Sequence, residues 1–494
     1  MSGVEANGLP DGWVTSTLAE VFDHLQYGFT AKAEHDGSSG PKFLRITDLQ
    51  VDGVDWATVP FCQAGEAETA KYLLNDGDFV FARSGSIEKA WRAVAPPVAV
   101  FASYLIRGRP LHSDVGPWLQ HFIRSGSYLE QIGAAGAGSG MSNVNAVKLG
   151  AVRFPVAPTH TRKRIVAKIE ALEARSEAAK EALDAIPPLL EKFRQSVLAA
   201  AFRGDLTKKW REANPDVEPA SVLLERIRDE RRRKWQKAHP NKKYVEPKPA
   251  DTDGLPELPE GWCWASVEEL SALVTSGSRG WGKFYAQSGA LFLRVGNLDR
   301  NTVALDLTNV VRVKPPKGSE GERTQVKPGD ILISITADVG MVAVIPDDLD
   351  EAYVNQHVAL VRLAAGLRPR CFGYSLTDPC GLQALVKDIQ YGATKASLSL
   401  AQVRRFPVPV PPLLEQTAIE EAIDGLLAGV VAFETQVRTG LGALAHMNQS
   451  ILAKAFRGEL VPQDPNDEPA SVLLDRIRQE RENGSSKPAR KRKP

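Results

Sequence analysis

Two kinds of hydrophobic pattern alternate along the chain. Residues 9–157 and 258–411 hold short apolar runs, such as "DFVFA", "DILISI" and "HVALVRL", broken by Gly, Pro, Asn and Asp. Runs of this length and composition predict β-strands. After the proline-rich segments "FPVAP" and "FPVPVPP" the apolar residues recur three and four positions apart. This spacing predicts helices, so we expect two β-rich domains, each followed by a helical region.

The alternation reflects an internal repeat, because one unit of about 250 residues is written twice. "LPDGW" (9–13) returns as "LPEGW" (258–262), and "QSVLAAAFRGDL" (195–206) returns as "QSILAKAFRGEL" (449–460). "EPASVLLERIRDER" (218–231) likewise returns as "EPASVLLDRIRQER" at 468–481. The expected domains are β-rich at 9–157, helical with a linker at 158–250, β-rich at 251–411, helical at 412–483, and a basic disordered tail at 484–494.

The helical regions share a heptad pattern that predicts a coiled coil. Apolar or small residues alternate by four and three positions in both copies, as in the seam between two supercoiled helices. Since the two seams are equally long, we expect them to pair antiparallel; an amphipathic helix docked on a globular body is the alternative. The predicted seam is Ile165, Ile169, Leu172, Ser176, Ala179, Leu183 and Ile186, paired with Ile419, Ile423, Leu426, Val430, Phe433, Val437 and Gly440.

Both seams are interrupted at one aligned position. The first has Pro187-Pro188 and the second has Gly440-Leu441-Gly442. Proline removes a helical hydrogen bond and clashes with the preceding turn, whereas glycine weakens a helix through its backbone freedom. We therefore expect a kink or a helix boundary in both copies.

Composition narrows the functional classes. The chain is 43% hydrophobic and 24% charged, and it has no apolar run long enough to span a bilayer. The N-terminus lacks a secretory signal pattern, so we expect a cytoplasmic protein without a membrane role. The four cysteines show no metal-ligand spacing, and we expect neither a zinc site nor disulfides. The net charge of +1 gives no argument for nucleic acid by itself.

Catalytic motifs are missing from the sequence. There is no phosphate-binding loop, HExxH or GxSxG motif, and no methyltransferase motif. The glycine-rich "GAAGAGSGMS" (133–142) follows a helix-like segment rather than a strand, so we expect a loop and not a nucleotide site. We expect a reader or scaffold that holds no cofactor or metal of its own.

The order of β-rich domain and helices, repeated once, resembles the specificity subunits of type I restriction-modification enzymes. The "LPDGW" and "LPEGW" openings, "FLR" at 43–45 and 292–294, "NQHVALVRL" at 355–363, "PPLLEQ" at 411–416 and the "AFRG" helix ends carry the resemblance. These motifs extend from Leu9 to about Arg481. One departure is visible, because the first copy reads "APTHTRKRI" where the second reads "PPLLEQTAI".

The resemblance implies an α+β fold with two target-recognition domains, separated by helices that form an antiparallel coiled coil. It implies a non-catalytic subunit that reads a bipartite, asymmetric sequence in double-stranded DNA. Two modification (methyltransferase) subunits and the restriction/translocase subunits would be its partners. S-adenosylmethionine, ATP and Mg would bind to those partners and not to this chain.

The first helix could act as a ruler between two DNA-reading domains. Arg162 to Ile186 is 25 residues, roughly 38 Å of helix at 1.5 Å per residue. One turn of B-DNA measures about 34 Å. Two readers so spaced could meet the same face of a duplex, and we hypothesise that this helix sets the unread spacer of the target.

The DNA-contacting residues are predicted from side-chain chemistry, since bases are read by Arg, Lys, Asn, Gln, Ser and Thr. Overall charge does not help: residues 1–155 hold 12 Lys and Arg against 16 Asp and Glu, and residues 256–410 hold 16 of each. The shared arginines Arg45 and Arg294 are expected to be structural or phosphate-facing. The candidates are Arg83, Ser84, Ser86, Lys89, Arg92, Ser139, Ser142 and Asn143 in the first domain, and Ser278, Arg279, Lys283, Thr336, Gln356, His357 and Lys395 in the second.

Other interpretations remain open at this point. The chain could be the specificity subunit of a methylation-only or type II-like system, or a coiled-coil adaptor without a DNA role. The basic runs at 226–243 and 487–494 are typical of a solvated helix end and a disordered tail, with auxiliary phosphate contact as the alternative.

Overall fold

The computed structural model describes residues 8–35, 40–50, 53–137, 142–277, 279–315, 318–378 and 397–485. It divides into two compact units, and each combines segments from both copies of the repeat. Unit 1 consists of Met1–Leu183 and Thr439–Pro494, and unit 2 consists of Asp184–Arg438. The β-rich part of each copy is therefore completed by helices of the other copy.

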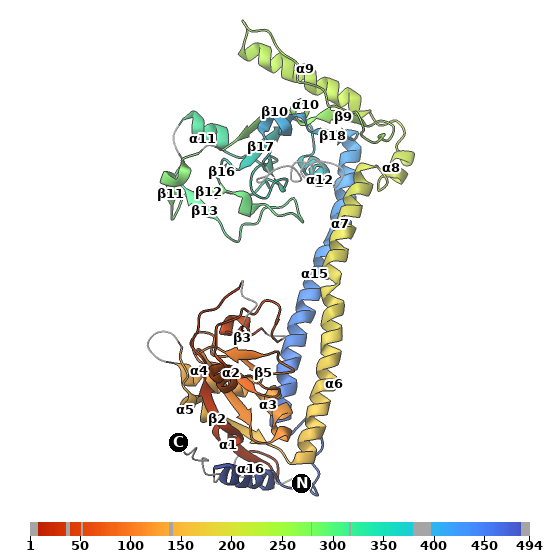
Figure 1. Ribbon diagram of the computed structural model, residues 1–494. Coiled ribbons are helices and arrows are strands. Elements are labelled where there is room, and N and C mark those ends of the chain that lie inside the picture. Colours follow the sequence, from red (N-terminus) through yellow and green to blue (C-terminus); the bar gives the residue numbers. More distant parts are fainter. Residues whose placement is uncertain are drawn as a thin grey trace. The chain divides into compact units, whose positions relative to one another are not determined.

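Unit 1 contains a β-rich part, a long helix and two helical segments from the end of the chain (Figure 1). Its elements are β1 (Val14–Thr17), α1 (Leu18–Val21), β2 (Phe22–Tyr27), β3 (Lys42–Leu44), η1 (Ile46–Asp48), α2 (Glu66–Tyr72), β4 (Phe79–Ala82), β5 (Ala90–Arg92), β6 (Ala99–Phe101), β7 (Leu105–Pro110), η2 (Ser113–Val115), α3 (Gly116–Phe122), α4 (Gly126–Gly136), α5 (Ala146–Gly150), β8 (Arg153–Val156), α6 (Thr159–Asp184), the C-terminal part of α15 (Leu413–Phe456) and α16 (Ala470–Ser485).

Unit 2 is built in the same way from the middle of the chain. Its elements are α7 (Ile186–Phe202), α8 (Lys208–Ala213), α9 (Ala220–Ala238), β9 (Cys263–Ser266), α10 (Val267–Leu270), β10 (Ser271–Ser276), η3 (Trp281–Phe284), β11 (Tyr285–Ala286), β12 (Ala290–Leu293), η4 (Val295–Asn297), β13 (Val311–Val313), α11 (Ser319–Thr324), β14 (Ile331–Ser334), β15 (Val342–Val344), β16 (Ala352–Val354), β17 (Val358–Leu363), α12 (Pro369–Thr377), α14 (Leu400–Arg405), β18 (Pro407–Val410) and the N-terminal part of α15.

A four-stranded antiparallel sheet lies at the centre of each β-rich part. The strand order is β2-β7-β4-β5 in unit 1 and β10-β17-β14-β15 in unit 2. The first strand of each sheet has a register shift at the same aligned place, between Phe22 and Leu25 and between Ser271 and Leu273. Central strands such as "FVFA" and "ILIS" are buried throughout, which explains why they are continuously apolar.

Further sheets complete each β-rich part, and one of them, in unit 2, has four strands in the order β11-β13-β12-β16. The ends of the part pair as β1 with β8 in unit 1 and β9 with β18 in unit 2, both antiparallel. A parallel pair also recurs, β3 with β6 and β12 with β16. The predicted fold class, α+β with an internal repeat, is confirmed by this matching topology.

The repeated "AFRG" phrase packs into the β-rich part of the other copy. In unit 1 the ring of Phe456 lies 4.6 Å from that of Trp118 and 5.5 Å from that of Phe122. In unit 2, Phe202 belongs to the same core cluster as Trp262. Aromatic burial of this kind contributes strongly to a core, so each helix end anchors a domain that precedes it or follows it in the chain.

The "EPAS" and "LP(D/E)GW" motifs also pair across the repeat. The Ala220 N–H at the start of α9 donates to the Gly261 carbonyl at 2.8 Å, and the Ala470 N–H at the start of α16 donates to the Gly12 carbonyl at 2.9 Å. Gly12 and Gly261 both have positive φ, +80° and +83°, a conformation that favours glycine. These turns therefore fix the position of the helix that follows each "AFRG" end.

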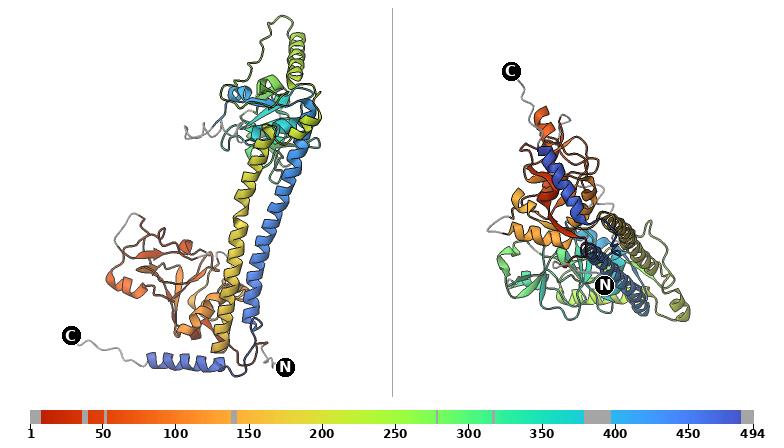
Figure 2. Two further views of the ribbon diagram at one scale, coloured as in Figure 1. Left: turned by 90° about the vertical axis from the view of Figure 1, so that its right-hand side faces the viewer. Right: turned by 90° about the horizontal axis from the view of Figure 1, so that it is seen from below.

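The long helices pair antiparallel within each unit. In unit 1, Ile165 and Ile169 of α6 share a core with Ile451, Leu452 and Phe456 of α15, and the two helices run side by side in Figures 1 and 2. At the other end of α6, Leu183 lies against Gly440. In unit 2, Arg194 of α7 pairs with Glu434, while Thr207 after α7 bonds Glu415. This order of contacts runs in opposite directions on the two helices.

The predicted seam needs a correction at two positions of α15. Ile419, Ile423, Val430 and Val437 are buried, but Leu426 is 39% exposed and Phe433 is 55% exposed. Leu427, one residue after Leu426, packs against the core of unit 2, and the exposed Glu434, one residue after Phe433, pairs with Arg194 of α7 at 3.3 Å. A polar residue at a seam is invisible to a purely hydrophobic pattern, so the prediction chose the apolar neighbour.

The seam of α6 contains both buried and exposed positions. Ile165, Ile169 and Ser176 are buried and Ala179 is exposed. Leu172 is half-buried against the core of unit 1. Leu183 and Ile186 are half-buried where α6 ends and α7 begins.

The predicted interruption occurs in one copy only. α6 ends at Asp184, and α7 starts at Ile186 with proline in its first turn. In contrast, α15 continues through Gly440 and Gly442. Glycine keeps its N–H and has no ring to clash, so packing against α6 can hold that helix intact.

Candidate nucleic-acid interface

Loops that carry many of the predicted DNA contacts meet at one edge of each four-stranded sheet. β2 and β4 end at this edge and β7 between them begins there, because both neighbours pair with β7 antiparallel. β10, β14 and β17 repeat the arrangement. We define the first rim as Tyr27, Arg83–Ser86, Tyr104, Ser142 and Asn143, and the second rim as Ser276, Thr336–Asp338, Gln356, His357 and Ser397.

Backbone pairing joins two loops in the first rim. Ser84 forms an isolated antiparallel bridge with Asn143. The Gly85 N–H donates to the Ser142 carbonyl at 3.1 Å, and the Val144 N–H donates to the Arg83 carbonyl at 2.8 Å. The structure thus brings together five of the predicted residues, which come from segments more than fifty residues apart: Arg83, Ser84, Ser86, Ser142 and Asn143.

Two tyrosines that the sequence reasoning missed complete the first rim. The Arg83 guanidinium lies 4.7 Å from the centre of the Tyr27 ring. The backbone N–H of Arg83 donates to the backbone carbonyl of Tyr104 at 3.0 Å. Tyr104 is 62% exposed and Tyr27 is 39% exposed. Exposed aromatic rings beside an arginine can stack on bases and support hydrogen bonds to them. Aligning the repeats could have found both, since they occupy the places of His357 and Ser276.

The second rim has the same backbone frame. Thr336 bridges to Ser397, and the Leu398 N–H donates to the Ile335 carbonyl at 2.9 Å. The Ile335 N–H in turn donates to the His357 carbonyl at 2.9 Å. Three predicted residues, Thr336, Gln356 and His357, therefore lie together at this edge.

The imidazole of His357 connects the polar side chains of the second rim. Its Nδ1 contacts the Thr336 hydroxyl, and its Nε2 lies 2.8 Å from the Gln356 amide nitrogen. A neutral imidazole donates from one nitrogen and accepts at the other. The two ring nitrogens thus hold Thr336 and Gln356 on either side of one imidazole.

One rim residue has an unfavourable backbone conformation. Ala337 has φ +63°, and Gly85, its aligned counterpart, has φ +69°. Left-handed backbone is uncommon for a residue with a Cβ, and such strain collects at functional sites. The repeated turn therefore belongs to the shared frame, whatever side chains it carries.

Several predicted contacts have structural partners elsewhere. Lys89 Nζ donates to the carbonyl of Ile46 (3.4 Å), the first residue of η1, and to that of Leu49 (2.8 Å), which follows η1. Arg92 donates to Gln120 Oε1 at 3.0 Å. These bonds engage both half-buried side chains within the domain, and their assignment as base contacts stays a prediction.

The remaining predicted residues lie beyond β10 or outside the described residues. Arg279 is exposed in the turn after β10, and Lys283 is exposed in η3 over the Phe284 ring. Ser139, Ser278 and Lys395 lie outside the described residues.

The arginines shared by the two "FLR" segments begin short helical turns. Arg45 donates to both carboxylate oxygens of Asp48, at 3.0 and 2.8 Å. The Arg294 backbone N–H donates to Asn297 Oδ1 at 3.0 Å. Arg45 is therefore engaged in a local structural contact.

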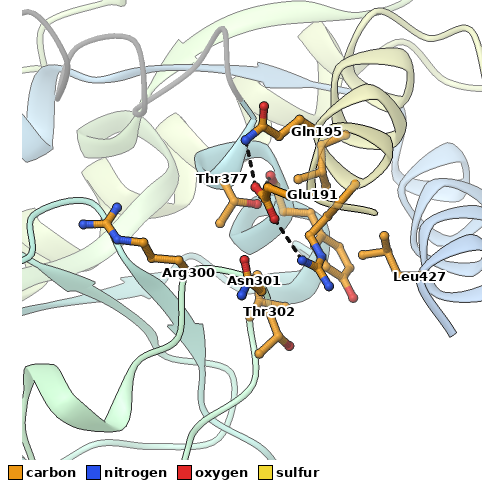
Figure 3. A pocket seen from close by; sticks show the side chains of 11 residues that line it. Glu191, Gln195, Arg300, Asn301, Thr302, Thr377 and Leu427 are labelled. Atoms are coloured by element: carbon orange, nitrogen blue, oxygen red, sulfur yellow. Dashed lines mark hydrogen bonds and ion pairs between the residues drawn. The ribbon is translucent and has the colours of Figure 1, made fainter. Parts of the chain in front are cut away.

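A cavity of about 240 Å³ lies in unit 2. It lies between α7 and the segment from Arg300 to Val303 (Figure 3). Glu191 accepts from Gln195 at 2.7 Å and from Arg194 at 3.0 Å. Arg300 pairs with Asp338 of the second rim at 3.1 Å. Most of these polar groups are engaged by one another or by Asp338, but the Arg194 Nε makes no hydrogen bond.

No metal centre is found in the part of the chain that the structure describes. Burial raises the pKa of the Cys62 and Cys263 thiols to about 11, which makes them poor nucleophiles at neutral pH. Across the same residues, the helices are too short or too polar to pass through a bilayer.

Known proteins share sequence with this chain. Residues 318–441 match the family model described as the type I restriction modification DNA specificity domain. The chain is 24% identical to the EcoKI specificity subunit of Escherichia coli K12, over 99% of this chain and all of that protein. It is 26% identical to the EcoBI specificity subunit of Escherichia coli, over 74% of this chain and 72% of that protein.

A solved structure shares the fold. It comes from work on complex assembly and conformational transition of the type I R-M system. The TM-score is 0.62 at 20% identity, over 92% of this chain and 99% of that one. The likeness in sequence and in fold thus extends over nearly the whole chain.

Proposed function

We infer that this chain is a specificity subunit of a type I restriction-modification system, the non-catalytic subunit that selects the DNA sequence. One observation carries the proposal: two rims with the same backbone frame bear different side chains. Ser84 and Thr336 make equivalent bridges, while Tyr104 is replaced by His357 and Tyr27 by Ser276. A common frame with divergent side chains suits two readers of two different DNA segments.

The target is then a bipartite and asymmetric sequence in double-stranded DNA. The first rim reads one part with Arg83, Ser84 and Asn143, and its tyrosines stack on or pack against bases or sugars. The second rim reads the other part with Thr336, Gln356 and His357. Gln suits adenine and Arg suits guanine, because each can make two hydrogen bonds in the major groove.

The partners follow from the same proposal. In the cytoplasm the chain joins two modification subunits, which hold S-adenosylmethionine, and the restriction/translocase subunits, which use ATP and Mg. Exposed apolar residues on the long helices, such as Leu189, Phe193 and Phe433, support docking of other subunits there. A modest overall charge also favours a complex in which partners supply phosphate contacts.

Mapping of methylated sites tests the assignment. Cells that carry the complete system should lose methylation at one bipartite motif when this chain is deleted. An unchanged methylome would favour the adaptor interpretation. Loss of methylation without any restriction of unmodified DNA would favour a methylation-only system.

Substitutions in the rims test the reading surface. Arg83→Ala and Tyr104→Ala should each weaken binding of the purified complex to its target about 10- to 100-fold, the usual range for a base contact. Gln356→Ala should relax selectivity only in the other part of the target. The matched controls are Arg153→Ala and Gln287→Ala, exposed residues outside the rims. Equal losses in control and rim variants would contradict the proposed surface.

A further inference from the structure

The two long helices begin with different side chains at aligned positions, and both starts are buried contacts. The first copy has Thr161 and Arg162 where the second has Glu415 and Gln416. Each start meets the segment that follows the "AFRG" end of the other copy. We call the contact in unit 1 (Thr161, Arg164, Asp467, Trp13 and Gln463) the first latch. The contact in unit 2 (Glu415, Thr207, Arg211 and Trp262) is the second latch.

In the second latch a carboxylate stands on the helix start. Glu415 is fully buried. Its Oε1 accepts from the Thr207 hydroxyl and from Arg211, both at 2.6 Å, and its Oε2 accepts from the Trp262 indole at 2.8 Å. Arg211 also donates to the Gly204 carbonyl at 2.7 Å. The anion thus lies on the start of α15 and the cation lies on the segment after α7.

In the first latch the charges are exchanged. The carboxylate is Asp467, after α15, and it accepts from the Thr161 hydroxyl and from Arg164 at 3.1 Å on α6. The Trp13 indole donates to Gln463 at 2.9 Å, and Gln463 donates to the Gly458 carbonyl at 2.6 Å. Gln463 therefore donates to the Gly458 carbonyl as Arg211 donates to the Gly204 carbonyl, but Gln463 is uncharged.

We call the segment after each "AFRG" end the exit of that copy. If a helix start met the exit of its own copy instead of the other's, these charges would be unmatched. Arg164 at the α6 start would then face Arg211, and neither Asp467 nor Glu415 would lie between the two cations. The α15 start would bring Glu415 to Asp467. A buried charge without its partner is strongly destabilising, and like charges in contact reject the wrong partner.

We propose that the two latches form a pairing code, so that each repeat accepts the other repeat and rejects a second copy of itself. The code acts during folding, when either helix start could meet either exit. It also acts between two chains, because it disfavours a dimer in which the first repeat of one chain pairs with the first repeat of the other. The proposal concerns assembly of the chain and does not depend on what the rims bind.

Reversal of the first latch tests the electrostatic part of the code in the full chain. Thr161→Glu places a carboxylate beside Asp467, and Asp467→Arg places a second guanidinium beside Arg164. Each variant should lower Tm by about 5 °C or more, because like charges then lie in contact. The double variant T161E/D467R restores an ion pair and should recover at least half of the summed loss. Glu468→Arg, in the neighbouring exposed pair with Arg476, is the matched control and should change Tm little.

The double variant also tests the pairing rule directly. In T161E/D467R both latches would carry an anionic start and a cationic exit, so a repeat could pair with its own kind. Two differently tagged chains of this variant, co-expressed with their partner subunits, should copurify several-fold more than wild-type chains do. Additive Tm losses in the double variant would overturn the code. A stable double variant that copurifies no more than wild type would also overturn it.

The second latch supplies an independent test, because its carboxylate, Glu415, is fully buried and lies in the other unit. Glu415→Gln removes the charge and keeps the shape, and it should lower Tm. Combining it with Arg211→Gln should lower Tm by less than the sum of the two single losses. Strictly additive losses at this latch would also overturn the proposal.

Discussion

At the residue scale, a shared turn geometry is occupied by glycine in one copy and by alanine in the other. Gly85 and Ala337 both have positive φ, near +69° and +63°. A Cβ added at Gly85 would meet no atom within 4 Å. Any cost of a side chain at this place therefore comes from the backbone conformation and not from crowding.

We expect Gly85→Ala to destabilise the protein by about 1 kcal/mol, since left-handed backbone is unfavourable for a residue with a Cβ. Ala337→Gly should be neutral or stabilise by up to about 1 kcal/mol, because relief of that conformation is offset by the greater freedom of glycine when unfolded. Urea unfolding of both variants measures this. A stabilising Gly85→Ala would show that the turn relaxes away from positive φ.

His121 gives a second prediction at the residue scale. Burial, with a contribution from Arg124, lowers its pKa to about 4. Glu173 lies 3.8 Å away, but it already pairs with Arg124 at 3.1 Å, and His121 Nδ1 makes no hydrogen bond. The neutral ring is therefore the folded form.

The unfolded chain should bind a proton at His121 below about pH 6.5 while the folded chain does not until about pH 4. This contribution is absent above pH 6.5, and stability falls as pH decreases from 6.5 to 4, by about 2 kcal/mol at pH 5. His121→Gln should lose that part of the pH dependence. Unfolding free energies at pH 7 and pH 5 measure it, and an unchanged difference between the two pH values would contradict the prediction.

At the element scale, proline and glycine at one aligned place have opposite outcomes. Proline in the first turn of α7 marks a helix boundary, whereas α15 passes through Gly440 and Gly442. A Cβ at Gly440 would lie 3.2 Å from the side chain of Leu183 on α6, but a Cβ at Gly442 would meet no atom within 4 Å. Gly440 therefore allows α6 and α15 to pack closely, whereas Gly442 makes no such contact.

We expect Gly442→Ala to stabilise the protein by up to about 1 kcal/mol, the difference in helix propensity between the two residues. Gly440→Ala should gain less or lose stability, because Leu183 must move aside. Thermal unfolding of the two variants, compared side by side, measures the difference. An equal gain in both would show that Gly440 is not a packing contact.

At the scale of the whole molecule, α15 contributes residues to both units. Leu413 to Arg438 belong to unit 2 and Thr439 to Phe456 belong to unit 1. α6 pairs with the second of these parts and is 26 residues long, about 39 Å at 1.5 Å per residue. This helix is the candidate for the ruler that sets the spacer of the DNA target.

Insertion of one heptad into α6 before Pro187, matched by one in the facing part of α15, should lengthen the unread spacer. Seven residues add about 10 Å, or about three base pairs at 3.4 Å each. Methylation mapping in cells that carry the longer chain gives the new spacer. A heptad placed instead in the segment after α9 is the control and should leave the motif unchanged. The ruler hypothesis fails if the matched insertion also leaves the spacer unchanged.

The sequence by itself determined the duplication and the change from β-rich to helical segments. These features depend on neighbouring residues, so local patterns reveal them. The bridge between Ser84 and Asn143 and the position of Tyr104 beside Arg83 depend on strand order, which no local pattern contains. Lys89 resembled a DNA contact because its chemistry is suitable, and only the fold shows that its ammonium binds carbonyls inside the domain.

Tertiary structure alone decided which helix end completes which domain. The copies of "AFRG" are nearly identical, so their sequence does not say that Phe202 belongs with Trp262 and Phe456 with Trp118. It also decided the contacts of α15, where the exposed Glu434 pairs with the buried Arg194 of α7. Polar partners that meet only after folding lie outside what hydrophobic spacing can predict, and in this chain they distinguish the two repeats.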